Sequence, residues 1–136
     1  MSAYTGPNAS LSDEEFIEHY ETYVLTEFTH EDHLRMAFAY ARKGGAAAAV
    51  GGARRIQGLA ERLGAPGKYH DTMTVAWARV VGHLAARSRA SDFEEFLHDH
   101  PQLRNRSLMS AHYSRGLLFS PAARAQFIEP DLAPLP

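Results

Sequence analysis

The sequence predicts an all-α protein with a single compact domain, and three observations support this fold class. Apolar residues return every three or four positions over several long stretches, which is the spacing of one helix face. Serine or threonine precedes several of these stretches, and glycine or proline follows, as expected at helix starts and ends. No stretch shows the sustained alternation of a strand. The 136 residues suffice for one hydrophobic core and leave no room for a second domain.

Three helices are expected in the first half of the chain, after a loose lead-in over residues 1–11. Ser12 with Glu15, and Thr29 with Asp32, are capping-box patterns that mark helix starts. Glycine pairs further along stop or weaken a helix. The helices expected from these signals are Asp13–Val24, His30–Lys43 and Ala46–Leu63.

Gly51–Gly52 falls inside the third of these helices, where glycine lowers helix stability. We expect a kink there, or a place where another segment or a ligand approaches the backbone closely. A phosphate-binding loop is a poor interpretation, because the Lys-Ser/Thr ending of that motif and a preceding strand are both missing.

The second half of the chain is expected to hold one long helix and several shorter ones. A Gly-Ala-Pro-Gly break over residues 64–67 separates it from the first half. Ser91 with Glu94 is a third capping-box pattern, and Ser120–Pro121 predicts an N-cap followed by a first-turn proline. The expected segments are a helix from about Lys68 to Arg87, a short helix between Ser91 and Pro101, an irregular helix over Gln102–Ser114, a last helix from Ser120 to Phe127 and an extended tail over residues 129–136. In total we expect about five to seven helices.

Composition and charge exclude several classes of function. The formal charge of −2 at pH 7 gives no reason to expect a nucleic-acid partner. No apolar run approaches the roughly 18 residues of a membrane span, and no signal-peptide pattern is present, so we expect a cytoplasmic protein without a membrane partner. Because the chain has no cysteine, a metal site would use His, Asp and Glu ligands.

The clearest candidates for chemistry are His30 and His33, at the start of the second expected helix. Residues three apart share a helix face, so both imidazoles should point the same way. The positive end of the helix dipole disfavours imidazolium there, which leaves neutral nitrogens able to bind a metal or accept a proton. The same dipole resists a bare cation, so a metal would also need anionic ligands from elsewhere.

Three further residues extend this set: His70 and Asp71 at the start of the long fourth helix, and His112 near the C-terminus. The leading hypothesis is that His30, His33 and His70 bind a divalent iron, copper, zinc or manganese ion. Asp71 or His112 would complete the metal site or move protons. Their convergence in space is an assumption, and for each histidine a structural role, such as a cap or a bond to a carbonyl, remains open.

Aromatic and basic residues suggest how a substrate would be held. Tyr40, Tyr69 and Trp77 suit the wall of an aromatic pocket, although large aromatic residues most often build the core. Arg115 is a candidate for binding a substrate carboxylate, although most arginines are solvated surface residues.

Five blocks of the sequence resemble a family of small bacterial helical proteins that has no established activity. The blocks are Phe28–Leu34, Tyr69–Thr74 together with Trp77, His112–Ser114, Leu118–Arg124 and Glu129–Leu132. The resemblance spans most of the chain from Phe28 onward. It implies a stand-alone small protein whose histidine-bearing blocks are its most recognisable segments, with Glu often standing in related chains where this one has Asp71.

Three functions remain open at this point. The first is a small metalloenzyme that acts on a small-molecule substrate. The second is a metal-free acid-base enzyme that uses the same histidines for an isomerisation, cyclisation or elimination. The third is a non-enzymatic module that binds a ligand or another protein through exposed helix faces or the tail. We also expect a homodimer, because a small helical domain readily buries a second apolar face against a copy of itself.

Overall fold

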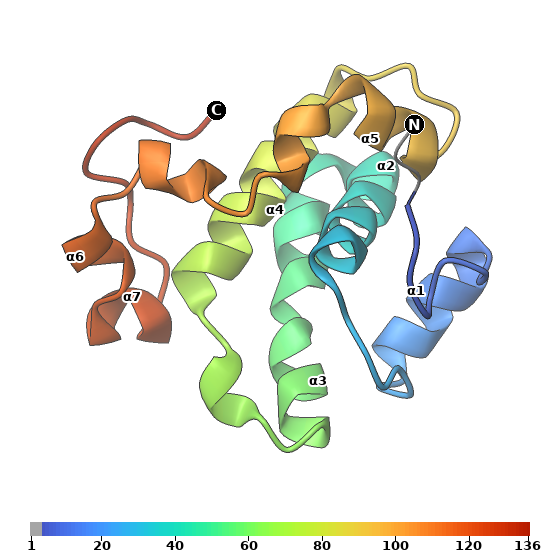
Figure 1. The fold of residues 1–136 in the computed structure, drawn as a ribbon, viewed down its shortest axis with the longest axis horizontal. Helices are drawn as coiled ribbons and strands as arrows, with labels where there is room; N and C mark the ends of the chain where they lie inside the picture. The colour runs from blue at the N-terminus through green and yellow to red at the C-terminus, as the bar shows by residue number, and fades with distance from the viewer. Residues whose placement is uncertain (1–3) are drawn as a thin grey trace.

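Two long helices form the centre of the fold and carry the other elements. The computed structural model describes residues 4–136 and contains no strand within them, which confirms the predicted all-α class. The central helices are α2 (His30–Arg54) and α4 (Asp71–Ala86), which pack against each other (Figure 1). The shorter helices are α1 (Asp13–Glu21), α3 (Ile56–Arg62), α5 (Phe93–Asp99), α6 (Arg115–Leu118) and α7 (Pro121–Ala125), with 3-10 helices η1 (Pro66–Lys68), η2 (Pro101–Arg104) and η3 (Leu108–Ala111).

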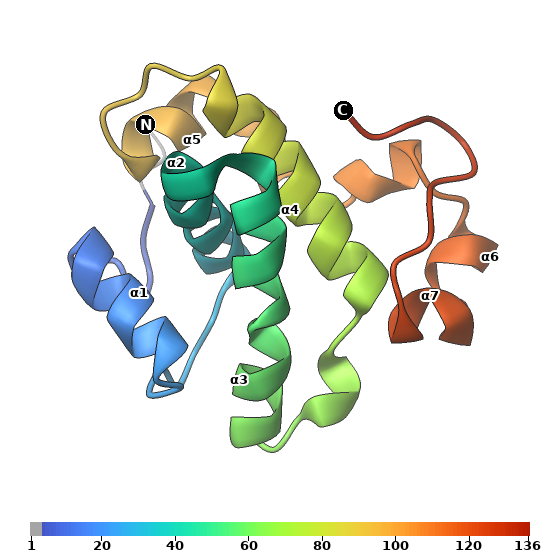
Figure 2. The same ribbon diagram turned by 180° about the vertical axis from the view of Figure 1, so that it is seen from behind.

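The short helices cover opposite sides of the central pair. Figures 1 and 2 show α1 beside α2, with α6 and α7 on the far side of α4. α5 crosses one end of α2, and α3 continues from the opposite end toward η1. None of the helices formed by residues 4–136 combines the length and the apolar character needed to cross a membrane.

The structure confirms the predicted N-caps at Thr29, Ser12 and Ser120. The Thr29 hydroxyl accepts from the backbone N–H of Asp32 at 3.1 Å, and the Asp32 carboxylate accepts from the N–H of Thr29 at 2.9 Å. Ser12 forms the equivalent capping box with Glu15 at the start of α1. Ser120 caps α7 as expected.

Several helix boundaries differ from the prediction: α4 begins at Asp71 rather than near Lys68, and α7 ends at Ala125 rather than near Phe127. The irregular helix expected over Gln102–Ser114 is instead formed by the separate 3-10 helices η2 and η3.

α1 ends at Glu21 rather than at Val24, because the Thr22 hydroxyl bonds back to a carbonyl of the last turn and Tyr23 adopts a positive φ of 59°. α5 is capped by Asp92 rather than by Ser91. The carboxylate of Asp92 accepts from the N–H of Glu95 at 2.9 Å, which moves the helix start one residue along the chain.

A sharp turn divides α2 into two parts, as the glycine pair in the sequence predicted. Gly44 and Gly45 have non-helical backbone angles, and Gly45 has a φ of 75°, which glycine adopts at little cost. The ribbon changes direction at this point (Figure 2). The second part was predicted to continue to Leu63, but a break at Arg55 separates it from α3. The N–H of Arg55 bonds three residues back to Gly52, which tightens the turn and interrupts the helix.

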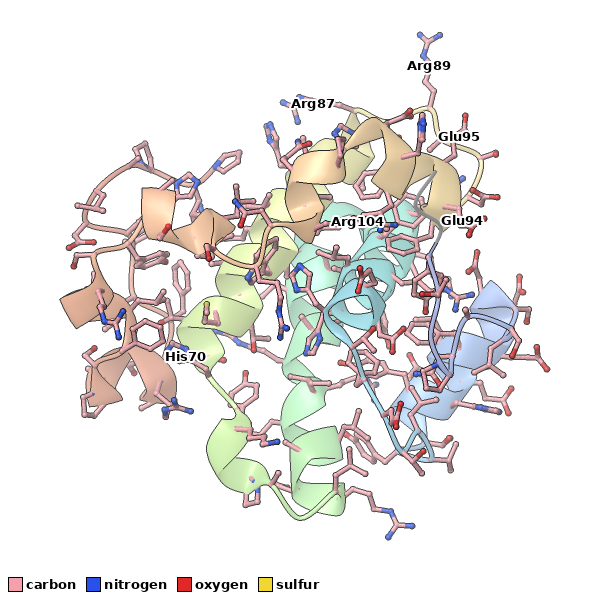
Figure 3. All side chains as sticks on the ribbon, in the orientation of Figure 1. His70, Arg87, Arg89, Glu94, Glu95 and Arg104 are labelled. Carbon is pink, nitrogen blue, oxygen red and sulfur yellow. The ribbon has the colours of Figure 1, made fainter. Side chains whose placement is uncertain are left out.

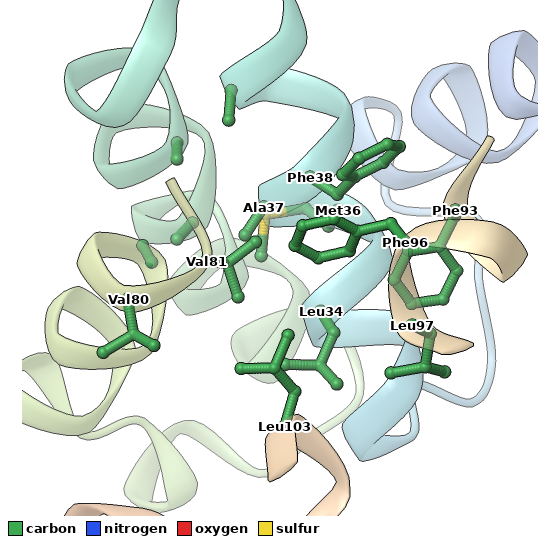
Figure 4. Close-up of a cluster of buried hydrophobic side chains, with 14 of the residues drawn as sticks. Leu34, Met36, Ala37, Phe38, Val80, Val81, Phe93, Phe96, Leu97 and Leu103 are labelled. Atoms are coloured by element: carbon green, nitrogen blue, oxygen red, sulfur yellow. The ribbon is translucent and has the colours of Figure 1, made fainter. Parts of the chain in front are cut away.

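The core lies between α2, α4, α5 and η2. Phe38 of α2 contacts Phe96 of α5 with ring centroids 4.6 Å apart, and Phe93 extends the same aromatic cluster. α2 and α4 approach so closely that a Cβ atom on Gly82 would lie 2.8 Å from the Cα of Ala46. Figure 4 shows the central side chains, which are Leu34, Met36, Ala37, Phe38, Val80, Val81, Phe93, Phe96, Leu97 and Leu103.

Residues 4–12 before α1 are packed against the body, although the sequence predicted a loose lead-in over residues 1–11. Residues 1–3 of that lead-in lie outside the part of the chain that the structure describes. Tyr4 and Asn8 are both buried, and both donate side-chain hydrogen bonds to Asp32, with Asn8 Nδ2 at 2.9 Å. Arg35 is also buried and donates to the carbonyls of Asn8 and Leu11. These contacts join residues more than 20 positions apart, which local sequence pattern does not reveal.

Two adjacent glycines of α2 offer a matched test of how closely the Tyr40 ring approaches the backbone of this helix. A Cβ atom at Gly52 would lie 2.3 Å from Cδ2 of Tyr40, whereas nothing lies within 4 Å of one at Gly51. We expect Gly52→Ala to lower the free energy of unfolding by about 1–3 kcal/mol through overpacking. Gly51→Ala should raise it by about 0.5–1 kcal/mol, because alanine favours the helix. Urea denaturation measures both, and equal effects at the two positions would contradict the close approach.

Candidate active site

A cavity of about 880 Å³ lies between both parts of α2, α3 and α4. This volume falls within the range of small-molecule binding sites. The loops around η1 and η2 complete its wall. Most of its surface is apolar, and the main apolar contributors are Leu34, Ile56, Leu59, Met73, Trp77 and Val81.

Backbone carbonyls determine which ring nitrogen is left free on each of two histidines in this cavity. Nε2 of His30 lies 2.8 Å from the carbonyl oxygen of Leu103, and Nδ1 of His33 lies 2.8 Å from that of Thr29. Because a carbonyl only accepts, these nitrogens carry the hydrogens in the neutral rings. The unprotonated nitrogens are therefore Nδ1 of His30 and Nε2 of His33.

The two unprotonated nitrogens have no partner in the described part of the chain and are accessible. Neither makes a hydrogen bond to any residue between Tyr4 and Pro136. Since no buried side-chain nitrogen or oxygen in this part of the chain lacks a partner, both nitrogens must be accessible. His30 and His33 both line the cavity, so the structure brings this predicted pair together.

Aromatic side chains hold both imidazole rings in place. His30 packs edge-on against Trp77 with ring centroids 4.8 Å apart, and His33 packs in the same way against Phe28 at 4.7 Å. Trp77 is the single tryptophan of the chain. It therefore forms part of the cavity wall, as predicted, and its fluorescence reports on this site alone.

The pKa of His33 is lowered from its ordinary value. The main cause is desolvation, because protein atoms surround most of the ring and disfavour imidazolium. The hydrogen bond to Thr29 and the charge of Asp32 act in the opposite direction, while His30 and Arg106 lower the pKa further. His33 is consequently neutral at pH 7, with a lone pair on Nε2. The helix dipole argument predicted a neutral ring here, but burial is the larger cause.

His70 lines the same cavity but has no free ring nitrogen. It is the N-cap of α4, one residue before the helix, where Nδ1 accepts from the N–H of Met73 at 3.1 Å. Its Nε2 donates to the carbonyl of Leu118 at 2.7 Å. Metal binding by His70 would require one of these bonds to break. Among residues 4–136, no three or more His, Asp or Glu side chains form a metal-binding group.

Asp71 lies outside this cavity, on a second one of about 520 Å³. Its carboxylate binds Arg54 through Nε at 3.2 Å and Nη2 at 3.1 Å, and it also accepts from the Tyr69 hydroxyl and from the N–H of Phe127 at 2.9 Å. Burial alone would raise the pKa of Asp71, but the hydrogen bonds from Arg54 and Tyr69 outweigh it and the pKa is lowered. Asp71 is thus an ionised carboxylate with its oxygens occupied.

The structure also places His112 away from the cavity. Nδ1 of His112 lies 3.0 Å from the carbonyl of Ala133, and its own carbonyl accepts from the N–H groups of Leu132 and Ala133. The N–H of Ser114 adds a bond to Asp131 at 2.8 Å. The block His112–Ser114 therefore attaches the C-terminal tail to the body.

Two of the four predicted substrate-binding residues line the cavity and two do not. Tyr69 and Trp77 line the cavity. Tyr40 does not, because its ring packs against Gly52 and its hydroxyl donates to Glu21. Arg115 is exposed on α6, where its guanidinium lies 5.8 Å from the centre of the Phe119 ring.

Sequence reasoning missed the basic residues of the cavity wall, which also holds two carboxylates. Arg104 and Arg106 line it from the loop at η2, and Lys68 lines it from η1, together with Glu27 and Glu31. Figure 3 shows Arg104 on the side of α2 and α5, and His70 on the opposite side at the start of α4. Only the Arg-Asn-Arg run after Pro101 hinted at a basic loop.

Comparison with known proteins adds no identification: no family model, no curated protein and no solved structure matches this chain. The resemblance of the five sequence blocks to a bacterial family therefore stays a prediction. We therefore infer the function from the geometry of the cavity and the chemistry of its residues.

The buried hydroxyl of Thr72 offers a test of the attachment between α4 and the C-terminal segment. It donates to the carbonyl of Gln126 and accepts from the N–H of Ile128, both at 3.1 Å. We expect Thr72→Val to lower the free energy of unfolding by about 1–3 kcal/mol, because both backbone groups lose their partner. Limited proteolysis should then cut the chain after Leu118 sooner. Thr22→Val, at an exposed hydroxyl, is the matched control and should change stability by less than about 0.5 kcal/mol.

The lowered pKa of His33 predicts a loss of stability in acid. Below the ordinary value of 6.5, the unfolded chain takes up a proton that the folded chain resists. The free energy of unfolding should therefore fall from pH 6.5 downward and stay unaffected by His33 above it. The imidazole proton shift of His33, followed by NMR, should have its midpoint below 6.5.

His33→Gln should weaken this acid sensitivity, as measured by urea denaturation at a series of pH values. His98→Gln, which removes a side chain that is 75% exposed, is the control and should leave the pH dependence as it is. A midpoint for His33 at or above 6.5 would contradict the assignment.

Proposed function

We propose that the chain is an enzyme that transfers a proton to or from a small organic molecule held in the large cavity, with Nε2 of His33 as the proton acceptor. The observation that carries this proposal is the fixed tautomer of His33. Its Nδ1 hydrogen is held by the Thr29 carbonyl at 2.8 Å, so the bare Nε2 is the nitrogen left for a ligand. A base with a lone pair inside a largely apolar cavity is a common element of acid-base catalysis.

Neighbouring groups support His33 in this role during a reaction. When Nε2 takes a proton from the substrate, the ring becomes positively charged, and the Thr29 carbonyl then accepts a stronger hydrogen bond from Nδ1. The carboxylate of Asp32 also favours the charged ring. The proton returns from Nε2 to another atom of the product or to water, which completes an isomerisation, cyclisation or elimination without a change in redox state.

His30 supplies a second acceptor close to the first. Its bare Nδ1 accepts a hydrogen bond from a substrate hydroxyl or N–H group, which orients the substrate against Trp77. The apolar wall excludes water and strengthens these polar contacts.

The elimination reaction of 5-nitrobenzisoxazole tests this proposal without knowledge of the natural substrate. A base removes the ring proton, and the electron pair of the C–H bond forms the nitrile. The N–O bond breaks, and its electron pair goes to the oxygen of the coloured phenolate product. We expect the protein to accelerate this reaction, and His33→Gln to lower kcat/KM by about 10²-fold. The rate should rise with pH to half its maximum below pH 6.5 and stay constant above, because only neutral His33 accepts a proton.

His98→Gln is the matched control for the loss of a histidine outside the cavity and should keep the wild-type rate. No acceleration by the wild type, or an equal rate for His33→Gln, would contradict the proposal. Circular dichroism of each variant checks that the helices are intact.

A metal-dependent enzyme is the second candidate, and one observation favours it. Metal-binding imidazoles usually donate their other N–H to a carbonyl or a carboxylate, and His30 and His33 both do so. Nδ1 of His30 and Nε2 of His33 would be two ligands of an iron, copper, zinc or manganese ion, with the substrate or water at the other positions. The same assay after exhaustive chelation separates the candidates. Retained activity supports the metal-free base, whereas loss that one of these metals restores supports the metal site.

A further inference from the structure

The cavity wall combines charged side chains with an apolar surface. η2 contributes Arg104 and the loop after it contributes Arg106. Nε2 of His30 contacts the carbonyl of Leu103 in η2. The surface from α3 is apolar and comes from Ile56, Leu59 and Leu63. A ligand that complements both surfaces has a polar group at one end and an apolar body.

Two cations of this wall, Arg106 and Lys68, are exposed and make no hydrogen bond or ion pair with residues 4–136, whereas Arg104 already has a partner. Arg106 and His33 line the same cavity, and the charge of Arg106 contributes to the lowered pKa of His33. Lys68 stands on η1, at a different part of the wall.

The balance of charge in the cavity favours an anionic ligand. Three cations line the cavity, Lys68, Arg104 and Arg106, against the two carboxylates of Glu27 and Glu31. Neither carboxylate lies within 4.0 Å of a cation of the described chain. A guanidinium matches a carboxylate in shape and binds it through two parallel hydrogen bonds.

From this arrangement we infer that the ligand of the cavity is a small carboxylic acid with an apolar body, and that Arg106 binds its carboxylate beside His33. The apolar body lies against Ile56, Leu59 and Trp77. This inference rests on the proposed function, because it names the substrate class of the same site. It assigns Arg106 a role in substrate selection, while proton transfer stays with His33.

Binding of 4-phenylbutyrate and of its uncharged amide tests the inference. The two probes share the apolar body and differ in charge, so their affinity ratio isolates the carboxylate contact. The change in Trp77 fluorescence and isothermal titration calorimetry each give a Kd. We expect the acid to bind at least about 10-fold more tightly than the amide, as a charged hydrogen bond worth about 1.4 kcal/mol would give.

Arg106→Gln should reduce this ratio to about 1 while the amide binds as before. Arg89→Gln removes another exposed arginine, which points away from the body in Figure 3, and should keep the wild-type ratio. Equal affinity for acid and amide in the wild type, or an unchanged ratio in Arg106→Gln, would overturn the inference.

A wrong assignment of the substrate class can be distinguished from a wrong assignment of the acid-base function. 5-Nitrobenzisoxazole carries no carboxylate, so its elimination does not require the ion pair between a ligand carboxylate and Arg106. If that reaction proceeds while the acid shows no preference over the amide, or neither phenyl probe binds, only the substrate class is wrong. If the reaction, the acid and the amide all fail, the cavity is not the proposed site.

Discussion

The buried carboxylate of Asp32 is the interaction on which the candidate site depends. It is 1% exposed, and it accepts hydrogen bonds from the backbone of Thr29, from Asn8 and from Tyr4. A buried charge is tolerated when it is hydrogen-bonded in this way. The carboxylate closes the first turn of α2 and holds the N-terminal segment against it. His30 and His33 belong to that turn, so their positions are set before any ligand arrives.

The opposite wall of the cavity depends on the first turn of α4. His70 bonds to Leu118, Asp71 to Phe127, and Thr72 to the backbone around Gln126. Three consecutive side chains therefore hold the C-terminal segment, which passes α4 on the side away from α2 (Figure 1). The helix they begin carries Met73 and Trp77 into the cavity. His70 and Asp71 thus support the site through the helix they anchor.

Local sequence pattern was sufficient for the fold class, for the caps at Ser12, Thr29 and Ser120, and for the shared face of His30 and His33. It was insufficient wherever a role depends on a distant partner. The free nitrogen of His30 follows from a carbonyl 73 positions away, and the attachment roles of Asp71 and His112 follow from backbone groups 56 and 21 positions away. Spacing along the chain does not encode these distances, which is why His70 looked equivalent to His30.

The opposite tautomers of His30 and His33 have a consequence for recognition. Each ring donates its hydrogen to a backbone carbonyl and keeps an accessible lone pair. The histidine pair itself therefore offers acceptors and no donor, and the guanidinium groups of Arg104 and Arg106 are donors on the same wall. An ether or ester oxygen placed against either histidine would face another lone pair. A hydroxyl, amine or amide group could instead donate a hydrogen bond to Nδ1 of His30 or Nε2 of His33. The site selects molecules that bring their own hydrogens to the histidine pair.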